Sequence, residues 1–504
     1  MTPTNVLILC VDQQTTKVLG CYGNDIIKTP NIDRLANQGV RFDNAYTPSP
    51  LCVPARATMA TGRHVHELNT WDGCHPYTGH TMSWGHHLVE AGHSAVSIGK
   101  LHYRNEADET GFSKQIMPMH VPEAGGDLIS LLRSPLPSGR NRSKLFETLG
   151  PGGSAKTDYD TLVTQKACAW LQDQAPQENK PWCLFVSQVS PHPPLNAPVK
   201  FFELYEYADI AMPKMLDAPL HPWIQQLRNT LNDADFMDDE AILLALRNYY
   251  GLCSFTDYNI GLILKTLEDS DLMDTTRIIF VSDHGDNLGA RTLWNKCNMY
   301  QEAAQIPMIV TGPGIPKGRV SKTGCSLLDI APTVLDGVGI DTASGDFNSL
   351  SRSLFSLANK PDDLERIVFS EYHGMGSPSA SYMIRRGHYK FIYYVGYSPE
   401  LFDLDSDPEE LKDLGMNPNY REIIEEYEAI LCNICDPESE DRRAKDKQQM
   451  SLEVAGGRET VEKLGWLQGT PVPGEKSDHL IKSTYRDMGG AVKSNNGPCI
   501  AAET

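Results

Sequence analysis

The sequence predicts an α/β fold built on one large, mostly parallel but mixed sheet with helices on both faces. Short apolar runs bounded by turn-forming residues predict five buried strands: Val6–Val11, Ala95–Ile98, Cys183–Val189, Arg277–Val281 and Met308–Val310. Helical patterns lie between them: Ile32–Gln38, Trp84–Ala91, Leu162–Gln174 and Glu240–Glu268. Strands that alternate with helices and are apolar throughout are typical of sheets covered on both faces.

The pattern changes after residue 365, which predicts a smaller C-terminal α+β domain. Three runs that alternate or are rich in β-branched and aromatic residues predict a small antiparallel sheet, and a fourth segment predicts a helix: Arg366–Tyr372, Ser381–Arg385, Tyr389–Tyr394 and Arg421–Leu431. We therefore divide the chain into a main domain (1–365), a small domain (366–435) and a C-terminal extension (436–504). The extension starts with a charge-dense segment, typical of a solvated helix or loop. We hypothesise that it packs on a neighbouring subunit of a homo-oligomer.

Composition excludes several classes of protein. The chain has 504 residues, 40% hydrophobic and 22% charged, which is ordinary globular usage and excludes a wholly disordered or collagen-like chain. The formal net charge of −20 argues against a nucleic-acid partner, although a local pocket can still be cationic. The 12 cysteines have no regular spacing, so they predict no disulfide framework, and the lone pair Cys432 and Cys435 is weak evidence for zinc.

The N-terminal residues carry no basic segment before their short apolar run, so no secretory signal is expected. No apolar stretch approaches the roughly 20 residues that span a bilayer. We therefore expect a cytoplasmic protein without a membrane partner. Residues 105–155 and 190–240 are rich in Pro, Gly and Ser, which predicts long excursions from the sheet of the kind that shape a substrate site.

Side chains that can bind a ligand or transfer a proton follow four of the predicted strands where each strand ends: Asp12 and Gln13, then Lys100 and His102, then His192, and finally Asp283 and His284. In an open α/β sheet the ligand crevice lies outside the carboxyl ends of the strands. One polar strand end would be explained by a turn or a helix cap, but four predict a site.

Two adjacent pairs, Asp12-Gln13 and Asp283-His284, predict a divalent cation site. Two carboxylates, an amide oxygen and an imidazole suit Ca²⁺, Mn²⁺ or Mg²⁺ better than a structural zinc ion. For any single Asp after a strand, a turn or N-cap role is the simpler interpretation. The pairing at two strand ends favours the metal site.

The most specific motif is LCVPARATMATGR at 51–63. Pro54 fits the first turn of a helix, which would put Cys52 at a helix N-terminus, where free N–H groups favour anions. The pattern C-x-P-x-R followed by T-G resembles the signature of type I sulfatases. Other segments resemble the same family: GKLH at 99–102, SPHPP at 190–194, DHG at 283–285 and Lys296. The resemblance covers roughly residues 5–415.

This resemblance implies an alkaline-phosphatase-like fold that hydrolyses sulfate esters. It implies that a maturation enzyme converts Cys52 to Cα-formylglycine, whose hydrate is the nucleophile, beside a divalent cation, with Ca²⁺ expected first. Arg56 would hold the nucleophile, and Lys100 would bridge nucleophile and sulfate. His102 would take a proton from the hydrate. Lys100, His192 and Lys296 would bind the substrate. His192 and Lys296 would also protonate or stabilise the leaving oxygen.

Gln13 and His284 resemble the choline-sulfatase and phosphonate monoesterase branch, so a phosphonate monoester or phosphodiester hydrolase stays open. The GKLH motif favours a sulfatase. A silent fold member that only binds anions is a third alternative. The substrate could be a sugar sulfate, an aryl sulfate or choline sulfate; choline would need a carboxylate and an aromatic cage, for which Trp71, Trp294 and Tyr103 are available.

Overall fold

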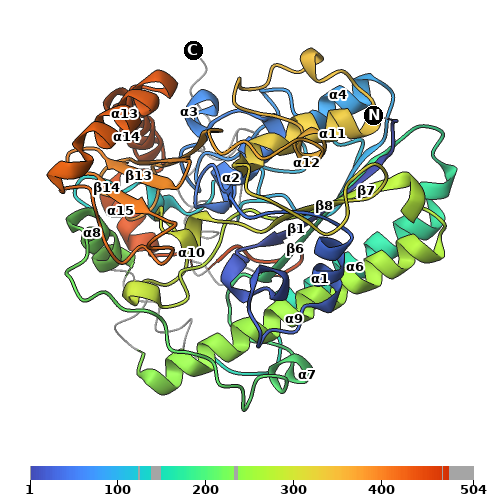
Figure 1. Cartoon of the computed structure of the whole chain (residues 1–504), viewed down its shortest axis with the longest axis horizontal. Coiled ribbons are helices and arrows are strands. Elements are labelled where there is room, and N and C mark those ends of the chain that lie inside the picture. Colours follow the sequence, from blue (N-terminus) through green and yellow to red (C-terminus); the bar gives the residue numbers. More distant parts are fainter. Residues whose placement is uncertain (1, 123–124, 138–148, 232–236, 468, 476–504) are drawn as a thin grey trace.

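The computed structural model describes residues 2–122, 125–137, 149–231, 237–467 and 469–475 (Figure 1). Its centre is an eight-stranded sheet in the order β5-β4-β6-β1-β7-β8-β2-β9. The strands are β1 (Asn5–Asp12), β2 (Gly39–Phe42), β4 (Ala95–Lys100), β5 (Lys114–Met119), β6 (Cys183–Pro191), β7 (Thr276–Ser282), β8 (Met308–Thr311) and β9 (Arg319–Ser321). All five predicted strands are present.

The sheet is mixed because of β8. β1 pairs in parallel with both β6 and β7, and β4 pairs in parallel with β5 and β6. β8 runs antiparallel to β7 and to β2. The chain leaves β7 at its carboxyl end and enters β8 from the same edge without a long crossover helix, so the strand direction reverses.

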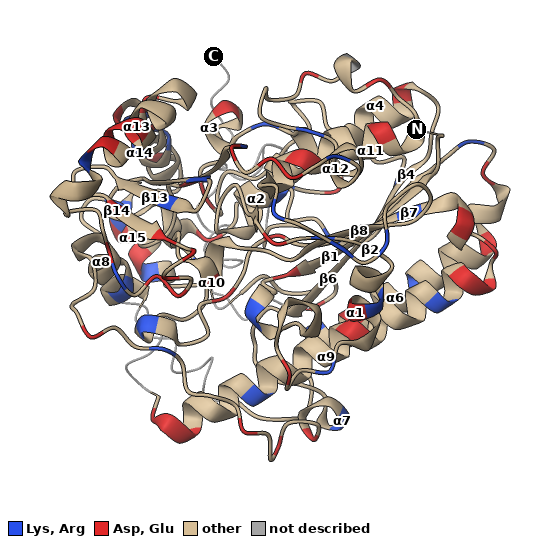
Figure 2. Ribbon diagram, viewed as in Figure 1, with Lys and Arg blue, Asp and Glu red and all other residues tan. Residues whose placement is uncertain are grey.

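Successive residues of β1 face opposite layers, as the period of a strand requires. Val6, Ile8 and Cys10 pack in one apolar cluster with α2 (Cys52–Thr61), α4 (Trp84–Glu90), α11 (Ile330–Val338) and α12 (Leu354–Ala358). Leu7, Leu9 and Val11 pack in a second cluster with α1 (Pro30–Asn37), α6 (Ala155–Asp173) and α9 (Asp239–Asp269). Helices therefore cover both faces, and charged residues lie along α1, α6 and α9 (Figures 1 and 2).

A separate antiparallel sheet follows in the order β11-β12-β13-β14. Its strands are β11 (Val368–Tyr372), β12 (Ser381–Arg386), β13 (Tyr389–Tyr394) and β14 (Glu400–Asp403), with α13 (Arg421–Ile434) against it. The predicted C-terminal sheet is confirmed with one more strand than expected. The remaining elements are β3 (Ala45–Tyr46), β10 (Cys325–Ser326), α3 (Val65–Leu68), α7 (Val199–Phe202), α8 (Pro222–Leu231) and α10 (Gln301–Ala304).

The C-terminal extension forms α14 (Pro437–Val454) and α15 (Arg458–Leu464). Both helices pack on their own chain: Ala444 meets Val65 and Trp71, and the amide of Gln448 donates to Asp72 at 2.7 Å. Further along, Leu452, Val461, Leu464 and Leu467 close over the segment Leu128–Leu132. Residues 476–504 lie outside the described part of the chain, so packing on a neighbouring subunit stays a prediction.

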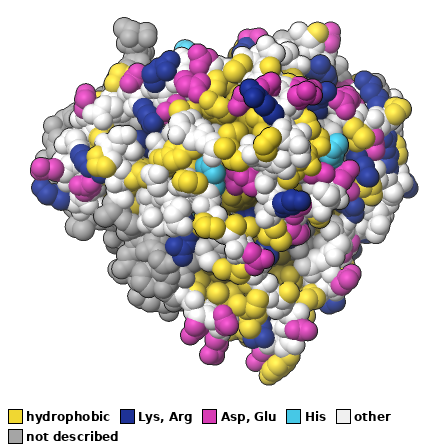
Figure 3. Space-filling view, turned by 60° about the vertical axis from the view of Figure 1, so that its left-hand side comes forward, with side chains coloured by type: hydrophobic (Ala, Val, Ile, Leu, Met, Phe, Trp, Pro, Cys, Tyr) yellow, Lys and Arg dark blue, Asp and Glu magenta, His cyan; other side chains and the backbone are white. Residues whose placement is uncertain are grey.

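On the face drawn in Figure 3, acidic and basic side chains are interspersed among apolar ones. Among the described residues, no helix combines the length and the apolar character needed to cross a bilayer.

Candidate active site

Four adjacent strands bring the predicted residues to one edge of the central sheet. β4, β6, β1 and β7 are neighbours, and the residues of interest end or directly follow them. Gly99 adopts φ +102°, and a Cβ there would collide with the carbonyl oxygen of Ser187. The register between β4 and β5 shifts between Ile98 and Lys100, at this glycine, and Lys100 is buried at the end of β4.

Cys52 is the first residue of α2 and only 4% exposed. Its Sγ lies 3.0 Å from Nε2 of His284, 3.5 Å from Nζ of Lys296 and 3.6 Å from an Asp12 carboxylate oxygen. Leu51 offers no side-chain cap to the helix, so first-turn N–H groups stay available to an anion. Burial raises the pKa of the thiol, although Lys296 opposes the shift.

The donor set beside Cys52 fits a divalent cation. Ligand atoms of Asp12, Cys52, Asp283 and His284 all lie within 4.8 Å of one another, and all four residues are buried. Nδ1 of His284 is 3.0 Å from the carbonyl oxygen of Gly285, so this nitrogen donates and Nε2 keeps its lone pair for the cluster. The Lys100 ammonium contacts the Asp12 carboxylate, which indicates that the space next to this carboxylate accepts a positive charge.

Gln13 is fixed next to this cluster. Its amide nitrogen donates to Asp286 at 2.5 Å, and its amide oxygen accepts from Lys296 at 2.5 Å. Sequence analysis did not single out Asp286, whose pKa burial raises to about 6. The amide oxygen of Gln13 therefore faces the cationic side of the site.

Arg56 links three strands of the central sheet: the ends of β7 and β4 and the middle of β6. Its Nε donates to Asp283 at 2.8 Å, and its Nη1 donates to the Lys100 carbonyl oxygen and to Ser187, both at 2.9 Å. Burial disfavours the charge on this guanidinium, but Asp283 outweighs burial and raises its pKa. Asp283 in turn has a lowered pKa: burial opposes its charge, and His284 and Arg56 overcome that cost.

His102 and His192 face the site without a charge of their own. Burial, assisted by Lys100, lowers the pKa of His102, and both of its ring nitrogens lack a partner among the described residues. Burial, assisted by Lys156, lowers the pKa of His192. Both imidazoles are therefore neutral near pH 7. Lys156 was missed by sequence analysis, because it lies in the first turn of α6 and no motif surrounds it.

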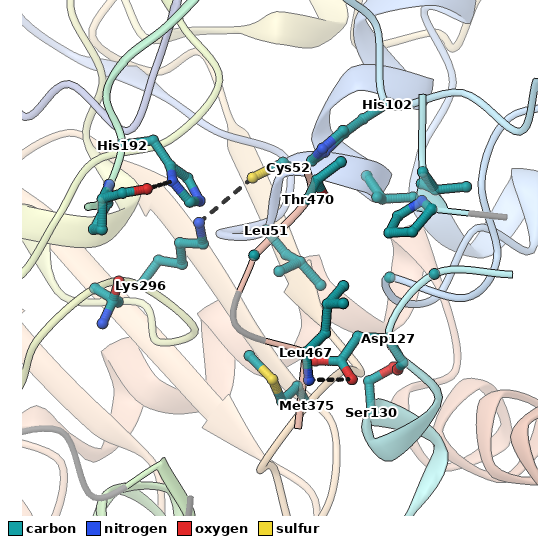
Figure 4. A pocket seen from close by; sticks show the side chains of 18 residues that line it. Leu51, Cys52, His102, Asp127, Ser130, His192, Lys296, Met375, Leu467 and Thr470 are labelled. Atoms are coloured by element: carbon teal, nitrogen blue, oxygen red, sulfur yellow. Dashed lines mark hydrogen bonds between the residues drawn. The ribbon is translucent and has the colours of Figure 1, made fainter. Parts of the chain in front are cut away.

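A cavity of about 120 Å³ opens beside these groups (Figure 4). Cys52, His102, His192 and Lys296 lie at one end, and Asp127, Ser130, Met375 and Leu467 lie at the other. Gly469 and Thr470 of the C-terminal extension complete the wall.

None of the described lining residues is a phenylalanine, tyrosine or tryptophan. The three aromatic residues considered for a choline cage lie elsewhere: Trp71 packs on His373, Tyr103 on Tyr77, and Trp294 in an apolar cluster with Tyr249.

Comparisons with known proteins show the family of the chain. A family described as "Sulfatase" matches residues 4–340, and one described as "N-sulphoglucosamine sulphohydrolase, C-terminal" matches residues 289–436. A choline-sulfatase of Rhizobium meliloti (strain 1021) is 31% identical over 429 residues, which are 82% of this chain and 83% of that protein. Arylsulfatase K of Gallus gallus is 28% identical over 454 residues, covering 85% and 82%.

Among solved structures, a phosphonate monoester hydrolase of Agrobacterium radiobacter superposes with a TM-score of 0.70 at 22% identity, covering 85% of this chain and 95% of that one. At this identity the likeness shows the fold alone. The fold and the residues at the sheet edge define an ester hydrolase of the alkaline phosphatase superfamily. Within that class the chain belongs to the sulfatase family and is a sulfuric ester hydrolase.

Proposed function

We propose that the chain hydrolyses a small sulfate monoester with a nucleophile that derives from Cys52 after its conversion to formylglycine. One observation carries this proposal: Cys52 starts a helix at the end of a cavity, with Lys296 3.5 Å and His284 3.0 Å from its sulfur. A nucleophile in such a place has positive groups on one side and substrate space on the other.

Asp12, Gln13, Asp283 and His284 are the residues that would hold the metal, for which we expect Ca²⁺ before Mn²⁺ or Mg²⁺. When bound, the ion supplies positive charge that lowers the pKa of a nucleophilic oxygen and offsets charge on the ester. The carboxylates supply the hard oxygen ligands, and the fixed tautomer of His284 supplies a lone pair at Nε2.

The remaining side chains have separate roles in this proposal. Lys100 and Lys296 bind the sulfate oxygens, and Arg56 holds the nucleophile's turn through its bond to Asp283. His192 gives a proton to the leaving oxygen as the S–O bond breaks. His102 accepts the proton from the nucleophile when sulfate departs, and its unpartnered ring nitrogens suit that role.

The cavity supports a compact ester with a largely apolar body. Its walls include Leu51, Val53, Val121, Met375 and Leu467. Asp127 at the far end could meet a hydroxyl or a cationic group of the substrate. We therefore place aryl and small alkyl sulfates first; choline sulfate has a carboxylate here but no described aromatic cage.

Gln13 and His284 also suit a second candidate reaction, which is the hydrolysis of a phosphonate monoester or a phosphodiester by the same residues. The buried lysine of the GKLH motif, Lys100, favours sulfate as the main substrate. We further propose a formylglycine-generating enzyme as partner, a cytoplasmic location and a homo-oligomer. A truncation after residue 475 that left the mass in solution and the activity unchanged would contradict an oligomer built on the tail.

The test uses the full chain co-expressed with a formylglycine-generating enzyme, with conversion of Cys52 measured by peptide mass. Turnover of 4-nitrophenyl sulfate, choline sulfate and an aryl phosphonate monoester is then compared with Ca²⁺ and with Mn²⁺. We expect sulfate turnover in proportion to conversion. Faster turnover of the phosphonate would favour the second reaction, and sulfate turnover in unconverted protein would contradict the nucleophile.

A further inference from the structure

Lys156 is a buried lysine that the mechanism above does not use. It lies in the first turn of α6 and is 9% exposed. A cation is disfavoured there, because the helix dipole places partial positive charge at the N-terminus. Among the described residues, no carboxylate lies within ion-pair distance of it. A buried charge in so unfavourable a place calls for a specific contact.

That contact is His192. Nζ of Lys156 lies 3.2 Å from Nδ1 of His192 and 2.7 Å from the carbonyl oxygen of Pro193. A lysine ammonium has three donors and no acceptor, so Nδ1 must accept. The ring proton of the neutral His192 then sits on Nε2. Because His192 lines the cavity, this tautomer supplies the donor that a leaving oxygen needs.

Without the lysine, the opposite tautomer has a partner ready. Nδ1 of His192 is 2.7 Å from the Pro193 carbonyl oxygen, which accepts only if Nδ1 carries the proton. Nε2 would then hold a lone pair and could not donate to the substrate. Lys156 therefore decides between a histidine that donates and one that does not.

We propose that Lys156 is a positioning residue that holds the His192 proton on Nε2 and replaces that proton as it leaves. This inference rests on the proposed role of His192. As the S–O bond breaks, the leaving oxygen takes the proton from Nε2, while Nδ1 takes one from the Lys156 ammonium. The products are an alcohol, a neutral imidazole and a neutral amine, which solvent protonates again. The protons balance without an imidazolate.

The surroundings of Lys156 suit this proton transfer. Burial, assisted by Lys296, lowers its pKa to about 8, whereas Cys52, Glu475 and Asp160 act in the opposite direction. The nearby Lys100 also has a lowered pKa, mainly through burial. A lysine with a pKa near 8 is charged at neutral pH and still gives up a proton readily. We expect the rate with poor leaving groups to fall above about pH 8.

The experiment compares K156M with the unchanged enzyme on phenyl sulfate, a poor leaving group, and 4-nitrophenyl sulfate, a good one. We expect kcat/KM to fall about 10–100-fold for phenyl sulfate and less than about 3-fold for 4-nitrophenyl sulfate, since only the poor leaving group needs the proton. K166M, an exposed lysine on the same helix, is the matched control. K156R should keep the tautomer but donate its proton poorly, so its loss of kcat/KM on phenyl sulfate should lie between that of K156M and that of the unchanged enzyme.

A second readout does not depend on turnover. In protein labelled with ¹⁵N-histidine, His192 should carry its proton on Nε2, and K156M should move it to Nδ1. K156L, which also has no hydrogen-bond donor, serves if K156M fails to fold. If K156M lost the same factor in kcat/KM on both esters and left the His192 tautomer unchanged, Lys156 would have only a structural role, and the inference would be overturned. If H192Q showed no leaving-group dependence, the proposed role of His192 would fail instead.

Discussion

Two buried clusters of charge in this molecule are built in opposite ways. The first, the inter-sheet network, joins the central sheet region to the C-terminal sheet through Lys214, Arg291 and Lys390 with Glu302, Glu409 and Glu410. Arg291 pairs with Glu302 at 2.8 Å, Lys390 with Glu410 at 2.6 Å, and Lys214 bridges Glu302 and Glu409 at 2.5 and 2.6 Å. In its interior three cations meet three carboxylates, and at the surface the exposed Lys17 also pairs with Glu409 at 2.5 Å. Each buried cation of the network therefore has a carboxylate partner.

The second cluster, the candidate active site, keeps unmatched positive charge among its described residues. Asp12 pairs with Lys100, and Asp283 with Arg56. Lys156 and Lys296 have no ion-pair partner among the described residues. The comparison shows what separates a structural ion cluster from a functional one: the first compensates its own desolvation, and the second leaves that task to an anionic ligand.

The strongest way to test this difference is to remove the proposed nucleophile. Cys52→Ala should lower sulfate ester turnover by at least about 10⁴-fold, because it removes the side chain from which the proposed nucleophile derives. The melting temperature should change little, since no ion pair is lost. Cys432→Ala, at an exposed cysteine, is the control. Full activity in Cys52→Ala would contradict the proposed mechanism.

Substitutions in the inter-sheet network should show the reverse: they should lower the stability of the fold. Glu410→Ala leaves the buried ammonium of Lys390 without a carboxylate partner, whereas Arg291 keeps Glu302, and the substitution should cost roughly 3–5 kcal/mol of unfolding free energy. Urea denaturation measures this. Glu409→Ala removes a carboxylate that is 44% exposed and should cost about 1 kcal/mol or less. Equal losses from both variants would show that burial does not govern the network.

Acid should weaken the network through Glu302. Burial opposes the charge on this carboxyl, but Arg291 and Lys214 overcome it and lower its pKa from 4.5 to about 2. Its contribution is therefore complete above pH 4.5 and is lost as the pH falls toward 2. Glu302→Gln should remove roughly 2–3 kcal/mol at neutral pH and flatten the pH dependence of stability over that window. Glu422→Gln, on the exposed side of α13, should leave the slope unchanged.

The smallest expected effect concerns the far end of the cavity. Asp127→Asn removes a carboxylate that lines the far end of the cavity, so preference for sulfate esters with a cationic group over neutral ones should fall roughly 5–10-fold. Ratios of kcat/KM for paired substrates measure this preference. Asp25→Asn, at an exposed site, controls for the general change in charge. An unchanged ratio would remove Asp127 from substrate selection.

The sequence predicted the sheet because buried strands such as β1 are apolar throughout and polar only where they end. The motif around Cys52 marked a helix start, and α2 begins at that residue. The reversed direction of β8 was not predictable, since a short apolar run has the same pattern in either direction. β14 was missed because its four residues alternate too briefly to be distinguished from a turn.

The parts of the site that escaped prediction come from distant segments. Lys156 meets His192 only because α6 packs on the sheet, and a lysine early in a helix carries no local signal. Thr470 reaches the cavity through two helices that pack on the surface of the same chain. Such contacts depend on tertiary packing, which periodicity and motifs do not report.

The depth of Cys52 sets an order of events during synthesis. The thiol is 4% exposed, and the wall of the cavity beside it is completed by Gly469 and Thr470, more than 400 residues further along the chain. A modifying enzyme cannot reach the sulfur once that wall has closed. The conversion proposed here therefore belongs to the interval in which residue 52 has been translated and the last segment has not yet docked, so slower maturation would leave folded but permanently inactive molecules.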